Sequence, residues 1–121
     1  MGEYEVLFFE GPGGECPTEE FLSGLPVKVQ AKTSKWLEML SRQGPNLPRP
    51  YADSVRDKIR ELRLGFGGMQ YRFLYFFHGK KVVVTHGFVK KTDEVPESEI
   101  ARAQKLRSGF YQRLEGGEIR L

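Results

Sequence analysis

Residues 56–91 read RDKIRELRLGFGGMQYRFLYFFHGKKVVVTHGFVKK, and this segment decides the fold. It contains three successive runs, IRELRL, YRFLYFF and KVVVTHGFVKK, that are rich in β-branched and aromatic residues and have the character of strands. The short segments Gly65–Gly68 and His78–Lys80 supply turns between the runs. Three strands joined by such short turns predict a meander of antiparallel hairpins.

The same segment concentrates positive charge. It has nine basic residues against two acids, which gives a local charge of +7 in a chain whose net charge is only +3. The basic residues are Arg56, Lys58, Arg60, Arg63, Arg72, Lys80, Lys81, Lys90 and Lys91. A cationic, aromatic-rich sheet predicts a polyanionic partner, and nucleic acid is the simplest one.

The flanking sequence adds one strand and three helices. Tyr4–Phe9 is a β-rich run, Pro17–Leu22 is typical of a short helix, and Pro26–Gln43 has helical apolar spacing that Gly44-Pro45 ends. Residues 45–50 are expected to form an extended linker. A last helix opens at Pro96, and its apolar stripe consists of Ile100, Ala103, Leu106, Phe110 and Leu114. The order β-α-α-β-β-β-α predicts an α+β fold with its helices on one side of an antiparallel sheet.

Length and composition indicate a single domain, residues 1–121, of an ordinary globular protein. Cys16 is the only cysteine, so an internal disulfide and a Cys-rich zinc site are excluded. The N-terminus lacks a signal pattern, and the apolar runs are too short to span a bilayer, so we expect a cytoplasmic protein. Residues 1–25 carry six acids and no basic residue. These acids either solvate the surface or keep RNA on the opposite side of the molecule.

A family resemblance rests on three pieces of this sequence taken together: ELRL, then YRFLYFFHGKKVVVTHGFVKKT, then PESEIARA. In this order they closely resemble the RelE/HigB family of toxins from bacterial or phage-borne toxin–antitoxin systems. The resemblance spans roughly residues 59–107. It implies a RelE/ParE-like fold, an antiparallel twisted sheet with two N-terminal helices and a C-terminal helix. It also implies a cytoplasmic endoribonuclease that cuts mRNA, usually on the ribosome, and that a cognate antitoxin, often of the helix-turn-helix type, neutralises.

Two strand arginines are the first candidate catalytic residues. RNA is cut without a metal when its own 2′-OH attacks the adjacent phosphate, and the enzyme must stabilise the added negative charge. Arg63 and Arg72 lie among apolar neighbours, which is costly unless an acid or a phosphate meets each guanidinium. A salt bridge to Glu61, to Asp57 or to a neighbouring strand is the structural alternative, but the shortage of local acids favours phosphate binding. The resemblance adds that Arg72 matches the arginine of the family's Y-R strand.

Lys90 and Lys91 are the other candidate catalytic residues, and they match the basic end of the corresponding family strand. A lysine among other cations has a lowered pKa and can serve as general base near neutrality. Alternatively, both lysines are solvated charges that attract RNA. Glu61 is a rival base, although so basic a setting should lower its pKa and weaken it.

The remaining candidates are expected to contact RNA: Lys58, Arg60, Lys80, Lys81 and His86. His86 shares strand parity with Phe88 and Lys90, and its alternative role is packing. No Cys/His ligand set or acidic cluster is visible in the sequence, so we expect no metal and no other cofactor.

Two other functions stay open. One is a toxin of the ParE kind, which blocks a topoisomerase without enzymatic activity; that branch generally lacks an Arg/Lys cluster on the sheet. The other is a plain RNA-binding module, which usually displays a pair of aromatic residues on one sheet face. Tyr71 and Tyr75 share a strand face, but it is the face opposite to Arg72.

Overall fold

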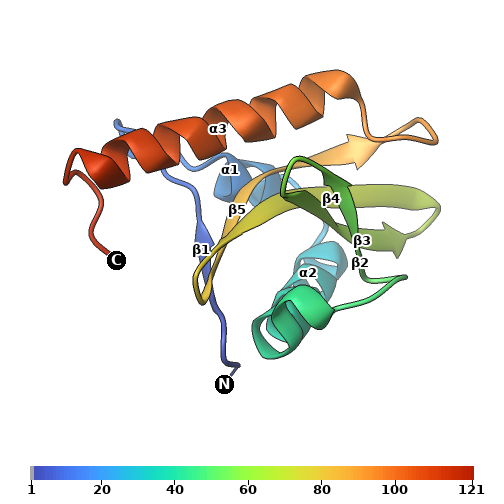
Figure 1. The fold of residues 1–121 in the computed structure, drawn as a ribbon. Helices are drawn as coiled ribbons and strands as arrows, with labels where there is room; N and C mark the ends of the chain where they lie inside the picture. Colours follow the sequence, from blue (N-terminus) through green and yellow to red (C-terminus); the bar gives the residue numbers. More distant parts are fainter. Residues whose placement is uncertain (1) are drawn as a thin grey trace.

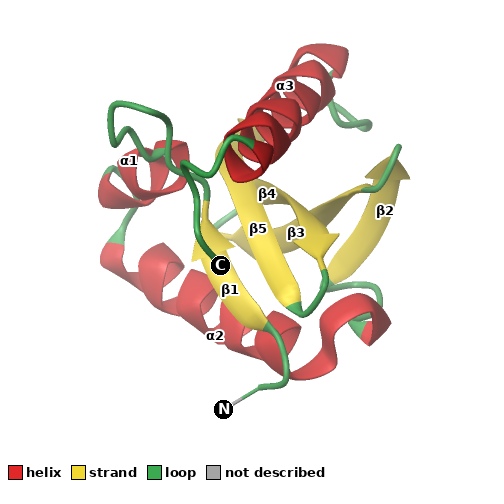
Figure 2. Cartoon of the chain, turned by 60° about the vertical axis from the view of Figure 1, so that its left-hand side comes forward, coloured by secondary structure: helices red, strands yellow, loops and turns green. Residues whose placement is uncertain are grey.

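A computed structural model describes residues 2–121 and shows a twisted five-stranded sheet with helices on both faces (Figures 1 and 2). The strands are β1 (Glu5–Phe8), β2 (Ala52–Arg56), β3 (Ile59–Phe66), β4 (Met69–His78) and β5 (Lys81–Lys90). Their order across the sheet is β1-β5-β4-β3-β2. The predicted meander β3-β4-β5 is confirmed, but β1 pairs with β5 in parallel, so the sheet is mixed rather than fully antiparallel.

The helices are α1 (Pro17–Ser23), α2 (Val27–Gln43) and α3 (Glu97–Glu115), and a 3₁₀ turn, η1 (Gly44–Asn46), follows α2. The expectation that all helices cover one side is wrong, because α3 lies on the opposite face from α1 and α2 (Figure 1). The central strands explain this arrangement. Along β4, Phe73 and Tyr75 belong to the core beneath α1 and α2, whereas Leu74 and Phe76 belong to the core beneath α3. A sheet that is apolar on both faces requires cover on both.

The edge strand β2 was not predicted from the sequence, because ADSVR is polar and follows a proline-rich segment. It pairs antiparallel with β3, and its side chains alternate between more and less buried positions. Asp57 and Lys58 connect the two strands and both have positive φ, 49° and 69°. Such angles are typical of the tight two-residue turns that join hairpin strands. The segment before β2 is not the expected extended linker, since it contains η1.

The C-terminal helix follows the predicted stripe. Ile100, Ala103 and Phe110 are buried, and Leu106 and Leu114 pack partly buried against the same core. The phenyl ring of Phe110 meets that of Phe76 edge-on, with centroids 5.5 Å apart. This packing fixes α3 over the end of β4 that lies away from Arg72. Within residues 2–121, no helix combines the length and apolar character needed to cross a bilayer.

Candidate functional site

Strand register brings cationic side chains together at one end of β3, β4 and β5. Arg63 lies directly opposite Arg72, and Gln70 lies opposite Lys90. One extra residue in β5 shifts the register between Leu74 and Tyr75 of β4, so Lys90 falls on the same sheet face as Arg72. Arg63, Arg72 and Lys90 therefore come from three adjacent strands and share one face. This face is the one that α3 covers at its other end.

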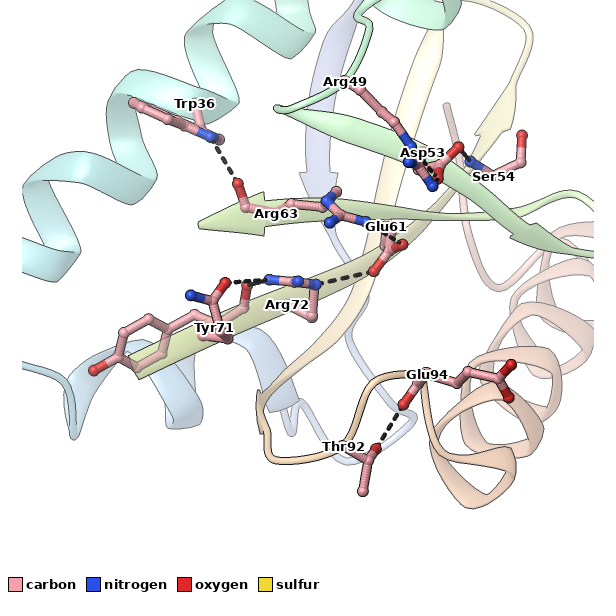
Figure 3. Close-up of polar contacts among 11 residues, drawn as sticks. Trp36, Arg49, Asp53, Ser54, Glu61, Arg63, Tyr71, Arg72, Thr92 and Glu94 are labelled. Carbon is pink, nitrogen blue, oxygen red and sulfur yellow. Dashed lines mark hydrogen bonds and ion pairs between the residues drawn. The ribbon is translucent and has the colours of Figure 1, made fainter. Parts of the chain in front are cut away.

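Glu61 lies between the two arginines and contacts both (Figure 3). Its Oε1 is 3.0 Å from Nε of Arg72, and its Oε2 accepts a hydrogen bond of 3.2 Å from Nη1 of Arg63. The side chains of Glu61 and Arg72 are only 7% and 4% exposed, whereas that of Arg63 is 27% exposed. The salt bridge considered as the structural alternative is thus present. One carboxylate between two guanidinium groups still leaves one positive charge without an acidic partner in this group.

Arg72 is also held by its own strand. Its Nη1 donates to the carbonyl oxygen of Tyr71 at 2.9 Å and approaches Oε1 of Gln70 at 3.5 Å. Burial lowers the pKa of Arg72, and the neighbouring charge of Arg63 acts in the same direction while Glu61 opposes both. The Nε of Arg72 is buried and faces Glu61 Oε1 in a close ion pair, so this nitrogen is directed at the carboxylate.

The two adjacent lysines differ in environment. Partial burial lowers the pKa of Lys90, and the positive charges of Arg72 and Arg63 lower it further, against the opposing effect of Glu61. Lys91 follows the end of β5 and is exposed. A lowered pKa increases the neutral amine fraction at neutral pH, which is the form that can accept a proton. Lys90 is therefore the better placed candidate for the base.

A cavity of about 310 Å³ opens beside the arginines at the edge of β3. It is lined by Lys32, Trp36, Pro50, Tyr51, Arg63, Leu64, Gly65, Gln70 and Arg72. Trp36 Nε1 donates to the carbonyl oxygen of Arg63 at 2.9 Å (Figure 3). Sequence reasoning missed Lys32, Trp36 and Tyr51 as site residues. Helical spacing assigned Trp36 to the core, and no local signal showed that α2 brings it beside Arg63.

The other predicted RNA contacts lie elsewhere. Arg60 points to the opposite face, where it donates to the Tyr75 hydroxyl at 3.4 Å and to Ser54 Oγ at 2.9 Å. Lys58 is exposed in the β2–β3 turn. Lys81 begins β5 and Lys80 directly precedes it. The nine residues from Lys81 to Lys90 correspond to roughly 30 Å along the strand. Lys80 and Lys81 form ion pairs with Glu3 and Glu5 rather than joining the arginine cluster.

His86 has no exposed surface with which to touch RNA in this conformation, since its side chain is 0% exposed. Its Nε2 lies 3.0 Å from Glu99 Oε1 on α3, and its Nδ1 lies 3.0 Å from Thr85 Oγ1. Burial lowers the pKa of His86 even though Glu99 acts to raise it. The geometry matches the packing alternative for this residue.

A larger cavity, about 1060 Å³, runs along β1 and is far less suited to RNA. Its lining includes five glutamates and no Lys or Arg: Glu3, Glu5, Glu10, Glu19 and Glu38. Four of these belong to the acidic N-terminal segment noted in the sequence. Such a lining repels phosphate, so the smaller cationic cavity is the better candidate for nucleic acid. Within residues 2–121, no group of three or more His, Cys, Asp or Glu is placed to hold a metal ion.

The chain is thus a small α+β protein with a mixed five-stranded sheet and a cluster of cationic side chains at one end of β3, β4 and β5. Residues 20–108 match the family model described as phage-derived protein Gp49-like (DUF891), and the chain belongs to this family. The Gp49-like family is part of the RelE/HigB-like toxin superfamily of toxin–antitoxin systems. No curated protein matches the chain significantly. The matched residues include α2, the meander and the first part of α3, and therefore the whole arginine cluster.

Proposed function

We propose that this protein is the toxin of a toxin–antitoxin system and that it cleaves mRNA as an endoribonuclease. The observation that carries the proposal is the convergence of Arg63, Arg72 and Lys90 from three adjacent strands, with Glu61 as the acid that both arginines contact. Membership of the Gp49-like family supports the toxin role. The cognate partner is an antitoxin, which we propose to be a helix-turn-helix protein.

The reaction is attack of a ribose 2′-oxygen on its own 3′-phosphate. The 2′-O–P bond forms, the P–O5′ bond breaks, and the proton of the 2′-OH passes to the neutral amine of Lys90. The two guanidinium groups donate to the phosphate oxygens, whose negative charge grows in the transition state. The leaving 5′-oxygen takes a proton from an acidic group of the complex between protein, mRNA and ribosome, or from water. The products are a 2′,3′-cyclic phosphate and a 5′-OH.

Glu61 serves this mechanism better as an anchor than as a base. Both of its oxygens contact guanidinium groups, and the carboxylate is buried. Both oxygens are thus engaged by the arginines, and neither is directed at a substrate 2′-OH. Glu61 instead orients the two arginines, much as a buried acid orients a catalytic group in other enzymes.

Cleavage is proposed to take place on the ribosome. The cationic face contributes one base candidate, Lys90, while the imidazole of His86 is buried against Glu99 of α3. A site with so few proton-transfer groups depends strongly on alignment of the attacking oxygen, and a ribosome that holds the mRNA extended supplies this alignment.

The test uses the purified full chain with mRNA in the presence and absence of ribosomes. The expected result is cleavage in the ribosome-containing reaction, with upstream fragments that end in a cyclic or 3′-phosphate. Fragments with a 3′-OH and a 5′-phosphate would overturn the 2′-OH mechanism. Intact mRNA together with inhibition of a topoisomerase would replace the ribonuclease by a toxin of the ParE kind. In cells, induction of the chain alone should stop translation, and co-expression of the neighbouring gene should restore it.

A further inference from the structure

The cavity beside the arginines has an aromatic wall that the proposed chemistry does not use. The rings of Trp36 and Tyr51 meet edge-on, with centroids 5.3 Å apart. The ammonium of Lys32 lies 5.0 Å from the centroid of the Trp36 ring and also donates to the carbonyl oxygen of Gly65. All three side chains are only partly buried. They combine two aromatic rings with a cation that lies over the ring of Trp36.

The aromatic wall is fixed to the same backbone that carries the candidate phosphate ligand. Arg63 donates its N–H to the carbonyl oxygen of Tyr51 at 2.8 Å, and its own carbonyl oxygen accepts from Trp36. A group held against this wall is therefore held at a fixed position relative to the Arg63 guanidinium. Gly65 keeps the floor open, because a Cβ at this position would lie 3.2 Å from the Gln70 amide nitrogen.

We propose that this cavity binds one nucleobase of single-stranded RNA, next to the phosphate held by Arg63 and Arg72, and that it selects guanine. The inference rests on the proposed function, whose substrate it specifies. A nucleobase fits because it is planar, stacks on aromatic side chains and carries its phosphate a few ångströms away. The volume of about 310 Å³ accommodates a purine.

Selection of guanine follows from the hydrogen-bonding groups around the cavity. Lys32, Arg63 and Arg72 are donors only. Gln70 offers both a donor and an acceptor, and its oxygen already faces Arg72 at 3.5 Å. A lining with an excess of donors favours a base edge made of acceptors. Guanine presents O6 and N7 side by side, whereas the same edge of adenine carries an amino donor.

The only tryptophan of the chain, Trp36, gives a direct readout that does not depend on cleavage. Its fluorescence is titrated with guanosine, adenosine, cytidine and uridine 3′-monophosphates. We expect saturable quenching by the guanosine nucleotide at a concentration at least about 10-fold lower than for the other three. Gln70→Ala, Lys32→Ala and Gly65→Val, which fills the floor, should each abolish this preference. Lys35→Ala is the matched control on the same helix, since Lys35 is exposed and lies outside the cavity lining. It should titrate like the unmodified protein.

The second arm is sequencing of the cleavage sites on ribosome-bound mRNA. Guanine should be enriched at one fixed position relative to the cut, and the enrichment should fall about 10-fold or more in Gln70→Ala. Equal quenching by all four nucleotides, or guanine preference that persists in all three cavity variants, would overturn the proposal. Selective quenching without any cleavage would retain the base site and overturn the ribonuclease. Cleavage without selective quenching would retain the ribonuclease and overturn the nucleobase site.

Discussion

Arg63 and Arg72 lie directly opposite each other on β3 and β4, and each contacts a different oxygen of Glu61. Like charges in facing positions of a sheet destabilise it unless something compensates them. Here one carboxylate compensates half of the charge. The remaining positive charge makes this end of the sheet attractive to a phosphate. The folding of this end depends on Glu61, because without it the two arginines would face each other uncompensated.

Arg72→Ala should lower cleavage by about 10²-fold or more, because a lost oxyanion donor costs that much in comparable sites. It should also destabilise the protein by roughly 3–5 kcal/mol, since Glu61 then remains buried with one partner fewer. Arg63→Ala should also lower cleavage. Its loss of stability should be smaller, because the Arg63 side chain is more exposed. Single-turnover cleavage and urea unfolding measure the two effects separately.

A double variant, Glu61→Gln with Arg72→Gln, separates the two roles of Arg72. It removes the buried charges together, so stability should largely return while cleavage stays low. Recovery of cleavage in this variant would reduce Arg72 to a structural residue.

Lys90→Ala should lower the chemical step by about 10²–10⁴-fold and leave RNA binding nearly normal, as expected for loss of a general base. Lys90→Arg should not restore the rate, because a guanidinium stays protonated. Lys91→Ala is the matched control: it should reduce the salt dependence of binding by about 0.7 of a unit and leave cleavage at saturation almost unchanged. Full activity of Lys90→Arg would make Lys90 an electrostatic anchor.

The pH dependence of cleavage should respond in opposite directions to two neutralising substitutions. Glu61 raises the pKa of Lys90, so Glu61→Gln should lower it and move the acid limb of the single-turnover profile to lower pH. Arg63 lowers the pKa of Lys90, so Arg63→Gln should move this limb to higher pH. The pH at the midpoint of this limb does not depend on how far the substitution lowers the maximal rate. Shifts in one common direction would rule out Lys90 as the titrating group.

Stability should fall as the pH decreases below about 7, with His86 as a contributor. Its folded pKa is lowered by burial from an ordinary value of 6.5, so below that value the unfolded chain binds more protons than the folded one. The stabilising effect of a neutral His86 is complete above pH 6.5 and is lost as the pH falls towards its folded pKa. In His86→Gln, the slope of unfolding free energy between pH 7 and 5 should be shallower by at most about 1.4 kcal/mol per pH unit. An unchanged slope would contradict this assignment.

The sequence predicted the meander well, because alternation, β-branched residues and glycine turns all act locally. It also placed Arg63 and Arg72 on adjacent strands. One helix layer was expected, because neither the polar strand β2 nor the placement of α3 has a local signal in the sequence; the structure shows a core on each face of β4. Lys80 and Lys81 were grouped with the site on charge alone. The hairpin register that places Lys81 opposite His78, and Lys90 opposite Gln70, separates them.

The cavity beside Arg63 and Arg72 could not be predicted from the sequence at all. Its aromatic wall and Lys32 come from α2 and from the segment before β2, and its two arginines come from β3 and β4. Only the packing of α2 against the sheet brings them together. Trp36 has the helical spacing of a core residue and packs against the core. The same side chain also lines the cavity, and the spacing of apolar residues gives no sign of this additional role.

The incomplete cover of β3 by β2 has a consequence for self-association. The last register pair of these strands joins Ala52 to Leu62, and beyond the bond from the Arg63 N–H to the Tyr51 carbonyl oxygen β3 has no strand partner on this side. An exposed strand edge invites pairing with another chain and aggregation. Here the carbonyl oxygens of Arg63 and Gly65 are already bonded to the side chains of Trp36 and Lys32. The contacts that shape the cavity thus also occupy acceptors along that edge and lower its tendency to pair with the edge strand of a second chain.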